Sequence, residues 1–210
     1  MATITDKPPV NLKFSHMGLS VRNIDEMERF YTEILGFTIT DRGLIENGMQ
    51  RPMSLVFLSR DPADHHQLVL ATGRPEAMPA NECNAQFGPS INQMSFQMAT
   101  IGDLRDIYGR LQEAGHGGLM PANHGVAWSI YAHDPEGNNL EFFVDTDWYF
   151  PQPFLVPLDF SKSDEDIRRE TEGLCRGQEG FEPYSQWRAR IAPKMHLFRA
   201  ASARAAGAVE

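Results

Sequence analysis

Residues 15–21, SHMGLSV, and residues 92–98, NQMSFQM, decide the fold of this chain because they are weak copies of each other. Both alternate apolar and polar side chains, which is typical of short β-strands. A repeat of this kind indicates two related structural units rather than one continuous fold. The same elements are therefore expected after each of the two stretches.

An amphipathic helix is predicted after each strand, at the same distance from it. In the first half the helical spacing ends at Gly36, and in the second half it ends at Gly115. The positions that pair at one constant offset are His16 with Gln93, Ile24 with Ile101 and Tyr31 with Tyr108. Three strand-like segments follow each helix, at 38–42, 53–59 and 67–71 and again at 119–121, 127–132 and 139–144.

The chain is therefore predicted to be an α+β protein made of two strand-helix-strand-strand-strand modules. We place the modules at residues 11–73 and 90–146, joined by a linker rich in Gly, Pro, Ala and Asn over 72–89. One module alone leaves a sheet face uncovered, so the two are expected to pack into a curved mixed sheet. Residues 147–210 are predicted to form an aromatic arm and two helices, which begin near Ser163 and near 183–185.

Composition excludes several classes of function. The 210 residues carry a net charge of -9, which argues against binding to nucleic acid. No apolar run reaches the roughly 18 residues of a membrane span, and residues 1–13 lack the apolar stretch of a secretory signal. Cys83 and Cys175 lie far apart, so we expect free thiols and a cytoplasmic protein.

Two motifs resemble a known family. The stretch 30–37, FYTEILGF, is similar to the helix end of a glyoxalase/bleomycin-resistance/dioxygenase module. The stretch 134–141, DPEGNNLE, is similar to the hairpin of that vicinal-oxygen-chelate superfamily, whose closing Glu binds metal. The resemblance covers about residues 11–146. It implies that the two modules surround one metal site.

Within the superfamily, the sequence most resembles the type I extradiol ring-cleavage dioxygenases. Their Fe(II) is held by two His and one Glu, and this resemblance implies His16, Gln93 and Glu141 as the metal ligands. Gln93 stands where those enzymes have the second His. The resemblance further implies three catalytic candidates: His66 as the acid/base, and Tyr131 and His124 as side chains that position the substrate.

The Gln in the ligand set affects which metal is expected. An amide oxygen is a harder and weaker donor than imidazole, so Fe(II) affinity should fall, and Mn(II), Zn or Ni also suit the set. Glyoxalases of the superfamily use a Gln ligand, but they usually have a fourth ligand at the position of Val69. The apolar residue there leaves three protein ligands, which favours the dioxygenase.

Strand geometry leaves the identity of the catalytic histidine open. His66 and Val69 are an odd number of residues apart, so on a regular strand they face opposite sides. His66 must therefore lie at the strand entry or at a bulge, and otherwise His65 faces the site. Histidine is suited to the task because its ordinary pKa, roughly 6.5, is close to neutral pH.

The function expected from the sequence is extradiol-type cleavage of a small catechol-like aromatic by O2, in a protein that resembles known homodimers. Two alternatives stay open. A non-oxidative metal lyase or isomerase is favoured by Gln93. A metal-free protein that binds a small molecule would need none of the metal-ligating side chains. For each candidate residue the competing interpretation is structural, such as a core histidine at His16 or a cross-strand aromatic at Tyr131.

Overall fold

The computed structural model describes residues 14–46, 52–80 and 91–192. In its first half, β1 (Met17–Val21) leads to α1 (Ile24–Arg29), which continues as the π-helical turn η2 (Phe30–Ile34). Three strands follow, β2 (Thr38–Ile45), β3 (Met53–Ser59) and β4 (Leu68–Thr72). They form a four-stranded sheet in the order β1-β4-β3-β2, in which β1 and β4 are parallel.

The second half repeats this arrangement. Strand β5 (Met94–Gln97) leads to α2 (Ile101–Glu113), and then come β6 (Met120–Asn123), β7 (Ala127–His133) and β8 (Asn139–Asp145). With the short β10 (Val156–Pro157) they form a five-stranded sheet in the order β10-β6-β7-β8-β5, and β5 runs parallel to β8.

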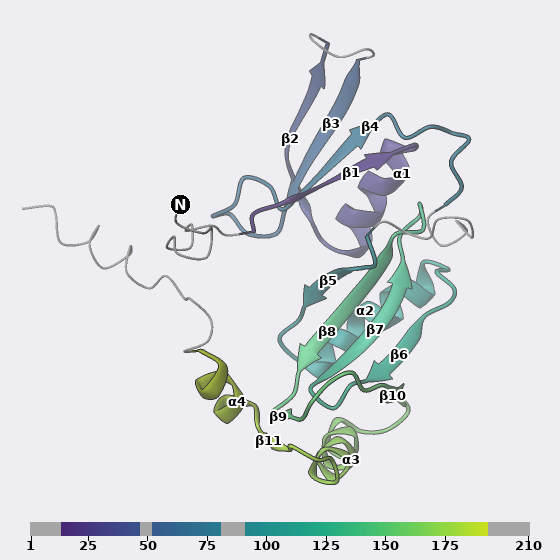
Figure 1. Cartoon of the computed structure of the whole chain (residues 1–210). Coiled ribbons are helices and arrows are strands. Elements are labelled where there is room, and N and C mark those ends of the chain that lie inside the picture. Colours follow the sequence, from purple (N-terminus) through teal and green to yellow (C-terminus); the bar gives the residue numbers. More distant parts are fainter. Residues whose placement is uncertain (1–13, 47–51, 81–90, 193–210) are drawn as a thin grey trace, which may run out of the picture.

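The predicted α+β class and the repeated order of elements are confirmed. The offset of the repeat also holds, because β1 and β5 begin at Met17 and Met94, and the two helices begin at Ile24 and Ile101. Two details differ from the expectation. The first helix changes into a π turn at Phe30, and the hydrogen bonds divide the strands into two sheets that lie one above the other in Figure 1.

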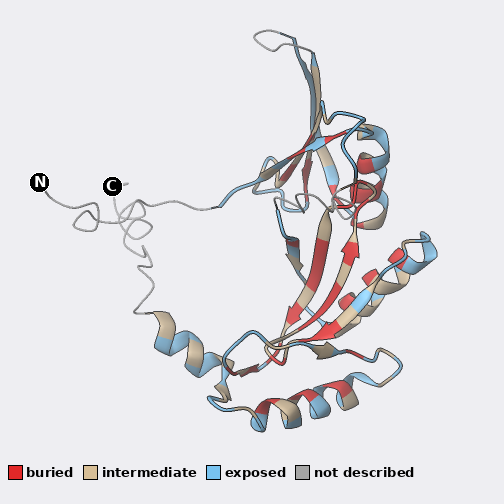
Figure 2. Ribbon diagram, turned by 45° about the vertical axis from the view of Figure 1, so that its right-hand side comes forward, coloured by how far each residue is buried: buried red, intermediate tan, exposed pale blue. Residues whose placement is uncertain are grey.

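Each sheet buries one face against its own helix. In β1 the side chains of Leu19 and Val21 are buried, and in β8 those of Leu140, Phe142 and Val144 are buried. Figure 2 shows this burial as red along β7 and β8 and on one side of α2. Because strand side chains alternate, the intervening residues face the other side of each sheet. That side carries polar groups, among them Glu141 on the second sheet, and His16 lies directly before β1 of the first.

The described part of the C-terminal extension packs on the second module. It contains β9 (Trp148–Tyr149), β10, α3 (Asp164–Arg176), β11 (Glu182–Pro183) and α4 (Tyr184–Ile191). As predicted, Ser163 caps α3, and its hydroxyl accepts a hydrogen bond from the Asp166 backbone. The hydroxyl of Thr171 on α3 accepts hydrogen bonds from Asn123 and from the Trp128 ring.

Several sequence expectations fall on parts of the chain that the structure leaves undescribed. Cys83, residues 81–89 of the proposed linker and the end of the chain from 193 onward lie outside the described residues. Cys175 is buried and forms no disulfide with any described residue. The division of the chain at residues 73, 90 and 147 stays a prediction. In the described ranges, no helix has the length and apolarity that crossing a bilayer requires.

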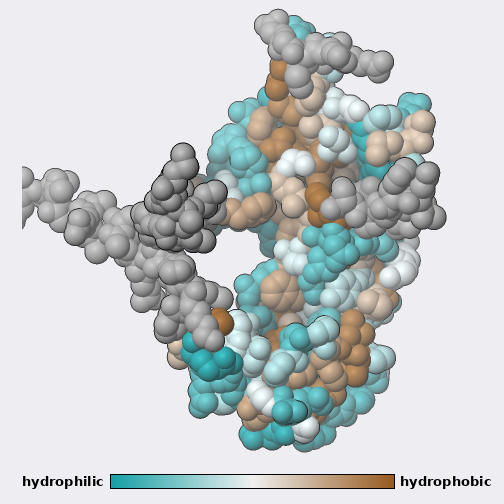
Figure 3. Space-filling view, viewed as in Figure 1, coloured by the Kyte–Doolittle hydropathy of each residue, from teal (hydrophilic) through white to brown (hydrophobic). Residues whose placement is uncertain are grey.

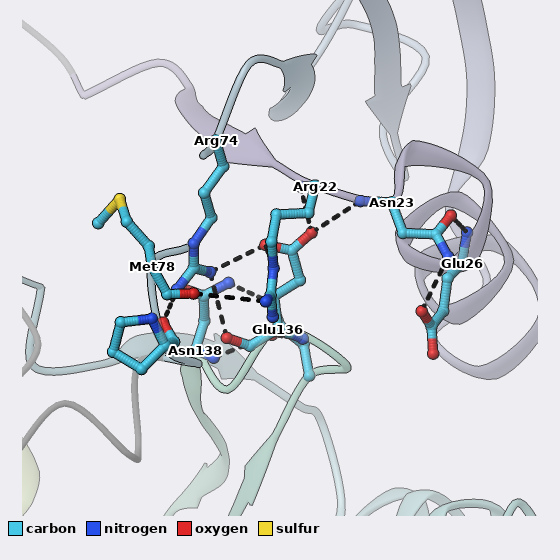
Figure 4. A network of polar contacts seen from close by, with 9 residues as sticks. Arg22, Asn23, Glu26, Arg74, Met78, Glu136 and Asn138 are labelled. Carbon is cyan, nitrogen blue, oxygen red and sulfur yellow. Dashed lines mark hydrogen bonds and ion pairs between the residues drawn. The ribbon is translucent and has the colours of Figure 1, made fainter. Parts of the chain in front are cut away.

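A buried carboxylate joins the two modules. Glu136, in the turn between β7 and β8, accepts hydrogen bonds from the backbone N–H groups of Arg22 and Asn23, where α1 begins. The Arg74 guanidinium lies 2.8 Å from the same carboxylate, and both side chains are almost fully buried (Figure 4). Nearby, the Tyr31 hydroxyl donates to Asp134, also in this turn. Residues 134–136 thus anchor the second module to the first.

We predict that Glu136→Gln destabilises the protein by about 3 kcal/mol, the usual cost of breaking a buried ion pair. The amide keeps the shape of the side chain, but it removes the negative charge and places an NH2 group against backbone donors. Urea unfolding measures the change. Glu170→Gln is the matched control, because Glu170 pairs with Lys162 at an exposed site and should lose less than about 1 kcal/mol. Equal losses in the two variants would contradict the assigned role of Glu136.

Candidate functional site

The side chain of Glu141 is the centre of a polar cluster on the second sheet. Only 9% of Glu141 is exposed, although it lies in the apolar strand β8. Its Oε2 accepts hydrogen bonds of 2.7 Å from Gln93 Nε2 and from Ser95 Oγ, and its Oε1 accepts one of 2.8 Å from Ser129 Oγ. These donors offset the cost of burying a carboxylate in an otherwise apolar strand.

Tyr131 and His124 extend the cluster. Tyr131 is paired with Glu141 across β7 and β8, and its hydroxyl lies 3.0 Å from His124 Nε2. The other ring nitrogen of His124, Nδ1, lies 2.8 Å from the backbone oxygen of Phe154 in the C-terminal extension. Hydrogen bonds thus join Gln93 to Glu141 and Tyr131 to His124, and the two pairs lie side by side across β7 and β8.

The environment of Tyr131 suppresses ionisation of its phenol. Burial, followed by the nearby Glu141 carboxylate with its negative charge, raises the pKa of Tyr131 from 10.0 to about 12. At neutral pH the phenol keeps its proton, so Tyr131 can take part in hydrogen bonds but does not act as a base.

The histidines of the first module form a second group. The rings of His16 and His66 lie with their centroids 4.2 Å apart, and His66 also contacts Phe57 at 5.2 Å. His65 Nδ1 lies 2.8 Å from His66 Nδ1. Partial burial, followed by the charges of His16 and His65, lowers the pKa of His66.

The position of His66 answers the question raised by strand geometry. Strand β4 begins only at Leu68, so His66 lies at the strand entry, where the alternation of a regular strand does not apply. Its ring reaches His16, whereas His65 lies against Phe57 and within 3.9 Å of an Asp41 carboxylate oxygen. Of the two, His66 is therefore the one in contact with the candidate ligand His16.

The structure groups the candidate residues into two sets: Gln93, Glu141, Tyr131 and His124 on the second module, and His16 and His66 on the first. Within the described residues, no cluster of three or more His, Cys, Asp or Glu side chains is arranged to hold a metal ion. The predicted ligand set has only two side chains of those types, and its third member is an amide. Whether these three meet at one cation remains a prediction.

The strand registers agree with the predicted equivalence of Val69 and Glu141. Val69 lies beside Gly18 of the parallel strand β1, and Glu141 lies beside Ser95 of β5, which is the repeat-related position. The first module thus carries an apolar side chain at the place where the second module carries its carboxylate.

A cavity of about 830 Å³ lies beside strand β5, and it is lined by Gln93 and Ser95 but not by Glu141, Tyr131, His124, His16 or His66. Gln93 and Ser95 border it on the edge strand β5, and Ser15 and Met17 border it at the start of β1, so the edges of the two sheets face the same space. Most of the remaining wall is apolar and includes Phe14, Leu35, Phe37, Met94, Phe96, Ile107 and Phe142. The volume and lining are typical of a site for a small organic molecule.

Sequence reasoning missed Ser95 and Ser129, which both donate to Glu141. A signal for both was present. Ser95 is two residues after Gln93, and Ser129 is two residues before Tyr131, so each shares a strand face with a candidate residue. Serine is common in strands, so sharing a strand face with a candidate residue did not by itself distinguish Ser95 and Ser129 from other serines.

Comparison with known proteins identifies the family. A model described as the Glyoxalase/Bleomycin resistance protein/Dioxygenase superfamily matches residues 13–142. The chain belongs to this superfamily. The fold agrees, because the structure is similar to a glyoxylase/bleomycin resistance protein/dioxygenase domain from Frankia sp. EAN1pec with a TM-score of 0.53. That match has 23% sequence identity and covers 65% of this chain and 100% of the other.

Two curated relatives of this superfamily member come from Rhodococcus globerulus. Biphenyl-2,3-diol 1,2-dioxygenase 3 is 29% identical over 140 residues, and the match covers 65% of each chain. Biphenyl-2,3-diol 1,2-dioxygenase 2 is 29% identical over 133 residues, which is 63% of each chain. The match thus spans less than two thirds of the length of either relative.

We predict that the contribution of Tyr131 to stability falls as the pH rises from about 10 to about 12. Because the pKa of Tyr131 is higher in the folded state, the folded state holds the proton more tightly than the unfolded state. The stabilisation is therefore complete below the pKa of the unfolded state, and it is lost as the pH rises toward the pKa of the folded state, about 12. Urea unfolding of the natural protein and of Tyr131→Phe, at several pH values, measures the effect. The stability difference between the two proteins should shrink over this interval, and a constant difference would contradict the prediction.

Proposed function

We propose that this protein is a metal-dependent dioxygenase of the extradiol type, which cleaves a catechol-like aromatic ring with O2. The observation that carries the proposal is the Glu141 cluster. A buried carboxylate is hydrogen-bonded to Gln93, and Tyr131, which pairs with Glu141 across β7 and β8, is hydrogen-bonded to His124. These are the residues that the resemblance to extradiol enzymes implies for metal and substrate.

The proposed metal ligands are His16, Gln93 and Glu141. Their donor atoms, an imidazole nitrogen, an amide oxygen and a carboxylate oxygen, fit a divalent first-row cation, and Fe(II) is the one that the proposed reaction uses. Such a cation acts as a Lewis acid that polarises bound oxygens and holds two reactants together. The Gln93 NH2 group donates to Glu141, so its amide oxygen is the atom available as a ligand.

His66 is the proposed acid/base. Its ring lies against that of His16, which would place it beside a substrate bound at the metal. The lowered pKa of His66 favours the neutral imidazole, and a neutral imidazole can accept a proton from a catechol hydroxyl. Returning that proton as the ring opens would complete its role. Tyr131 and His124 are proposed to position the second substrate oxygen.

The proposed substrate is an aromatic diol. The aromatic walls of the cavity beside Gln93 and Ser95, Phe96 and Phe142, lie on the helix-facing side of the second sheet, opposite Glu141, so the proposal rests on the candidate site residues and the relatives and not on this cavity. Brown apolar surface is visible over the first sheet in Figure 3, whereas α3 and α4 at the bottom of that view are largely polar. The two curated relatives are named for biphenyl-2,3-diol, which makes that compound the first to test. The homodimer expected from the resemblance stays a prediction.

A non-oxidative metal enzyme is the second candidate. It is favoured by the amide of Gln93, which replaces the imidazole expected in an iron dioxygenase and suits Mn(II), Zn or Ni. The two candidates differ in their need for O2, so a single set of measurements separates them.

We expect protein reconstituted with Fe(II) without oxygen to consume O2 when biphenyl-2,3-diol or another catechol is added with O2. A yellow ring-opened product should accompany the oxygen uptake, because extradiol cleavage produces a conjugated chromophore. Glu141→Gln should lose the activity together with at least about a hundredfold in metal affinity, more than the loss of an outer hydrogen bond costs.

The matched control is Asp145→Asn, on the same strand and the same face, where the carboxylate bonds to Gln97 and Arg188. It should bind metal as the natural protein does. Oxygen uptake that is absent over a broad panel of catechols, in protein that holds stoichiometric Fe(II), would refute the dioxygenase. Oxygen-independent turnover with Zn, Ni or Mn would support the second candidate instead.

Ser129→Ala should weaken the binding of a divalent metal by about 10- to 100-fold, the usual effect of removing a hydrogen bond that orients a ligand. Ser129 is fully buried, and its hydroxyl holds Oε1 of Glu141. Calorimetric titration with Mn(II) measures the affinity without oxidation of the metal. Ser59→Ala, at a similarly buried serine bonded to Asp61, should leave it unchanged. Equal affinities in the two variants would show that Ser129 does not orient the ligand.

A further inference from the structure

The C-terminal arm, residues 147–160, holds His124 from two sides. The backbone oxygen of Phe154 lies 2.8 Å from His124 Nδ1. The side chain of Gln152 donates to the backbone oxygen of His124 at 3.2 Å and accepts from the backbone N–H of Phe154 at 3.0 Å. Gln152 thus fixes the distance between the Phe154 carbonyl and the His124 ring.

The arm is itself firmly seated on the second module. Val156 pairs with Asn123, immediately before His124, as part of the five-stranded sheet. Phe150 is buried with 3% of its surface exposed, and its ring packs so tightly on Gly125 that a Cβ atom there would overlap it. Both neighbours of His124 in the sequence are therefore in contact with the arm.

These contacts determine which nitrogen of His124 carries the proton. A carbonyl oxygen only accepts hydrogen bonds, so the contact with Phe154 requires the hydrogen on Nδ1. In the neutral imidazole, Nε2 is then an acceptor. The hydroxyl of Tyr131, 3.0 Å away, is the donor that meets it.

The phenol of Tyr131 has one proton and two neighbouring acceptors, His124 Nε2 and Glu141. Glu141 already receives hydrogen bonds from Gln93, Ser95 and Ser129, whereas Tyr131 is the donor that the structure provides for His124 Nε2. With the proton on the side of His124, the Tyr131 oxygen has lone pairs left for another donor.

We propose that the C-terminal arm is a working part of the site: through the Phe154 carbonyl it fixes His124 as the Nδ1–H tautomer, so that Tyr131 donates to His124 and presents an acceptor oxygen to a hydroxyl of the ligand. The site would then select a ligand that still carries a hydroxyl proton at this position. Gln152 and His124 are positioning residues in this scheme. The part that concerns the ligand rests on the proposed function, and the tautomer does not.

The arm lies beyond residues 13–142, where the superfamily model matches, so this role belongs to the extension and not to the two modules. The extension does more than cover the module, because its backbone sets the direction of a hydrogen bond inside the candidate site.

Long-range nitrogen–proton NMR of the imidazole rings tests the tautomer directly and needs neither metal nor ligand. The signal of His124 is assigned by its absence in His124→Gln. At about pH 8, above the ordinary imidazole pKa of roughly 6.5, we expect the Nδ1–H pattern in the natural protein. In Gln152→Ala we expect a shift toward Nε2–H. Gln178→Ala is the control, because Gln178 also bonds a backbone oxygen in the extension but lies apart from His124. An Nε2–H pattern in the natural protein overturns the proposal.

Anaerobic binding of catechol to the Fe(II)-loaded protein, followed by tryptophan fluorescence, tests the consequence for the ligand. Tyr131→Phe should weaken binding about tenfold, which is the worth of one hydrogen bond. His124→Gln keeps an acceptor near Nε2 and should stay within about threefold of the natural protein. His124→Asn keeps only a donor near Nδ1 and should behave as Tyr131→Phe does.

A double-mutant cycle separates positioning from general stability. Gln152→Ala should weaken catechol binding about threefold in the natural background and have no effect in Tyr131→Phe, because its influence passes through that hydroxyl. An equal effect in both backgrounds overturns the proposal. Failure of the natural protein to bind any catechol would refute the proposed function and the ligand part of the scheme, and the NMR result would still decide the tautomer.

Discussion

The buried carboxylate of Glu141 is the constraint on which the candidate site depends. A charge within an apolar strand is costly unless donors surround it, and Gln93, Ser95 and Ser129 supply them. These donors come from the two strands that flank β8. The cost of burying one carboxylate therefore fixes the side chains on three strands.

The two modules are related by repetition but differ in what they contribute. The second supplies the carboxylate, the amide and the Tyr131–His124 pair, and the first supplies the imidazoles of His16 and His66. A site that uses side chains from both modules requires the two modules to keep a fixed position relative to each other. The Glu136 turn provides such a connection, because it accepts backbone hydrogen bonds from the first module and forms an ion pair with Arg74 directly after that module.

The C-terminal extension contributes a contact to the candidate site. A neutral histidine can carry its proton on either ring nitrogen, and the hydrogen-bond partner of one nitrogen determines which tautomer is present. Here the partner is a backbone carbonyl of the extension, at Phe154. A segment outside the duplicated modules can in this way determine whether a phenol within them donates or accepts, which is a property of the ligand that the site prefers.

The sequence by itself determined the α+β class, the repeat and its register, because alternation and helical spacing are local properties of the chain. It also singled out Gln93, Glu141, Tyr131 and His124, which the fold places in two neighbouring hydrogen-bonded pairs. The tertiary structure alone decided that Ser95 and Ser129 hold the carboxylate, that His66 rather than His65 contacts His16, and that Phe154 holds His124. Those contacts depend on strand pairing and on backbone atoms distant in the sequence, and no local pattern of side chains encodes where such atoms meet.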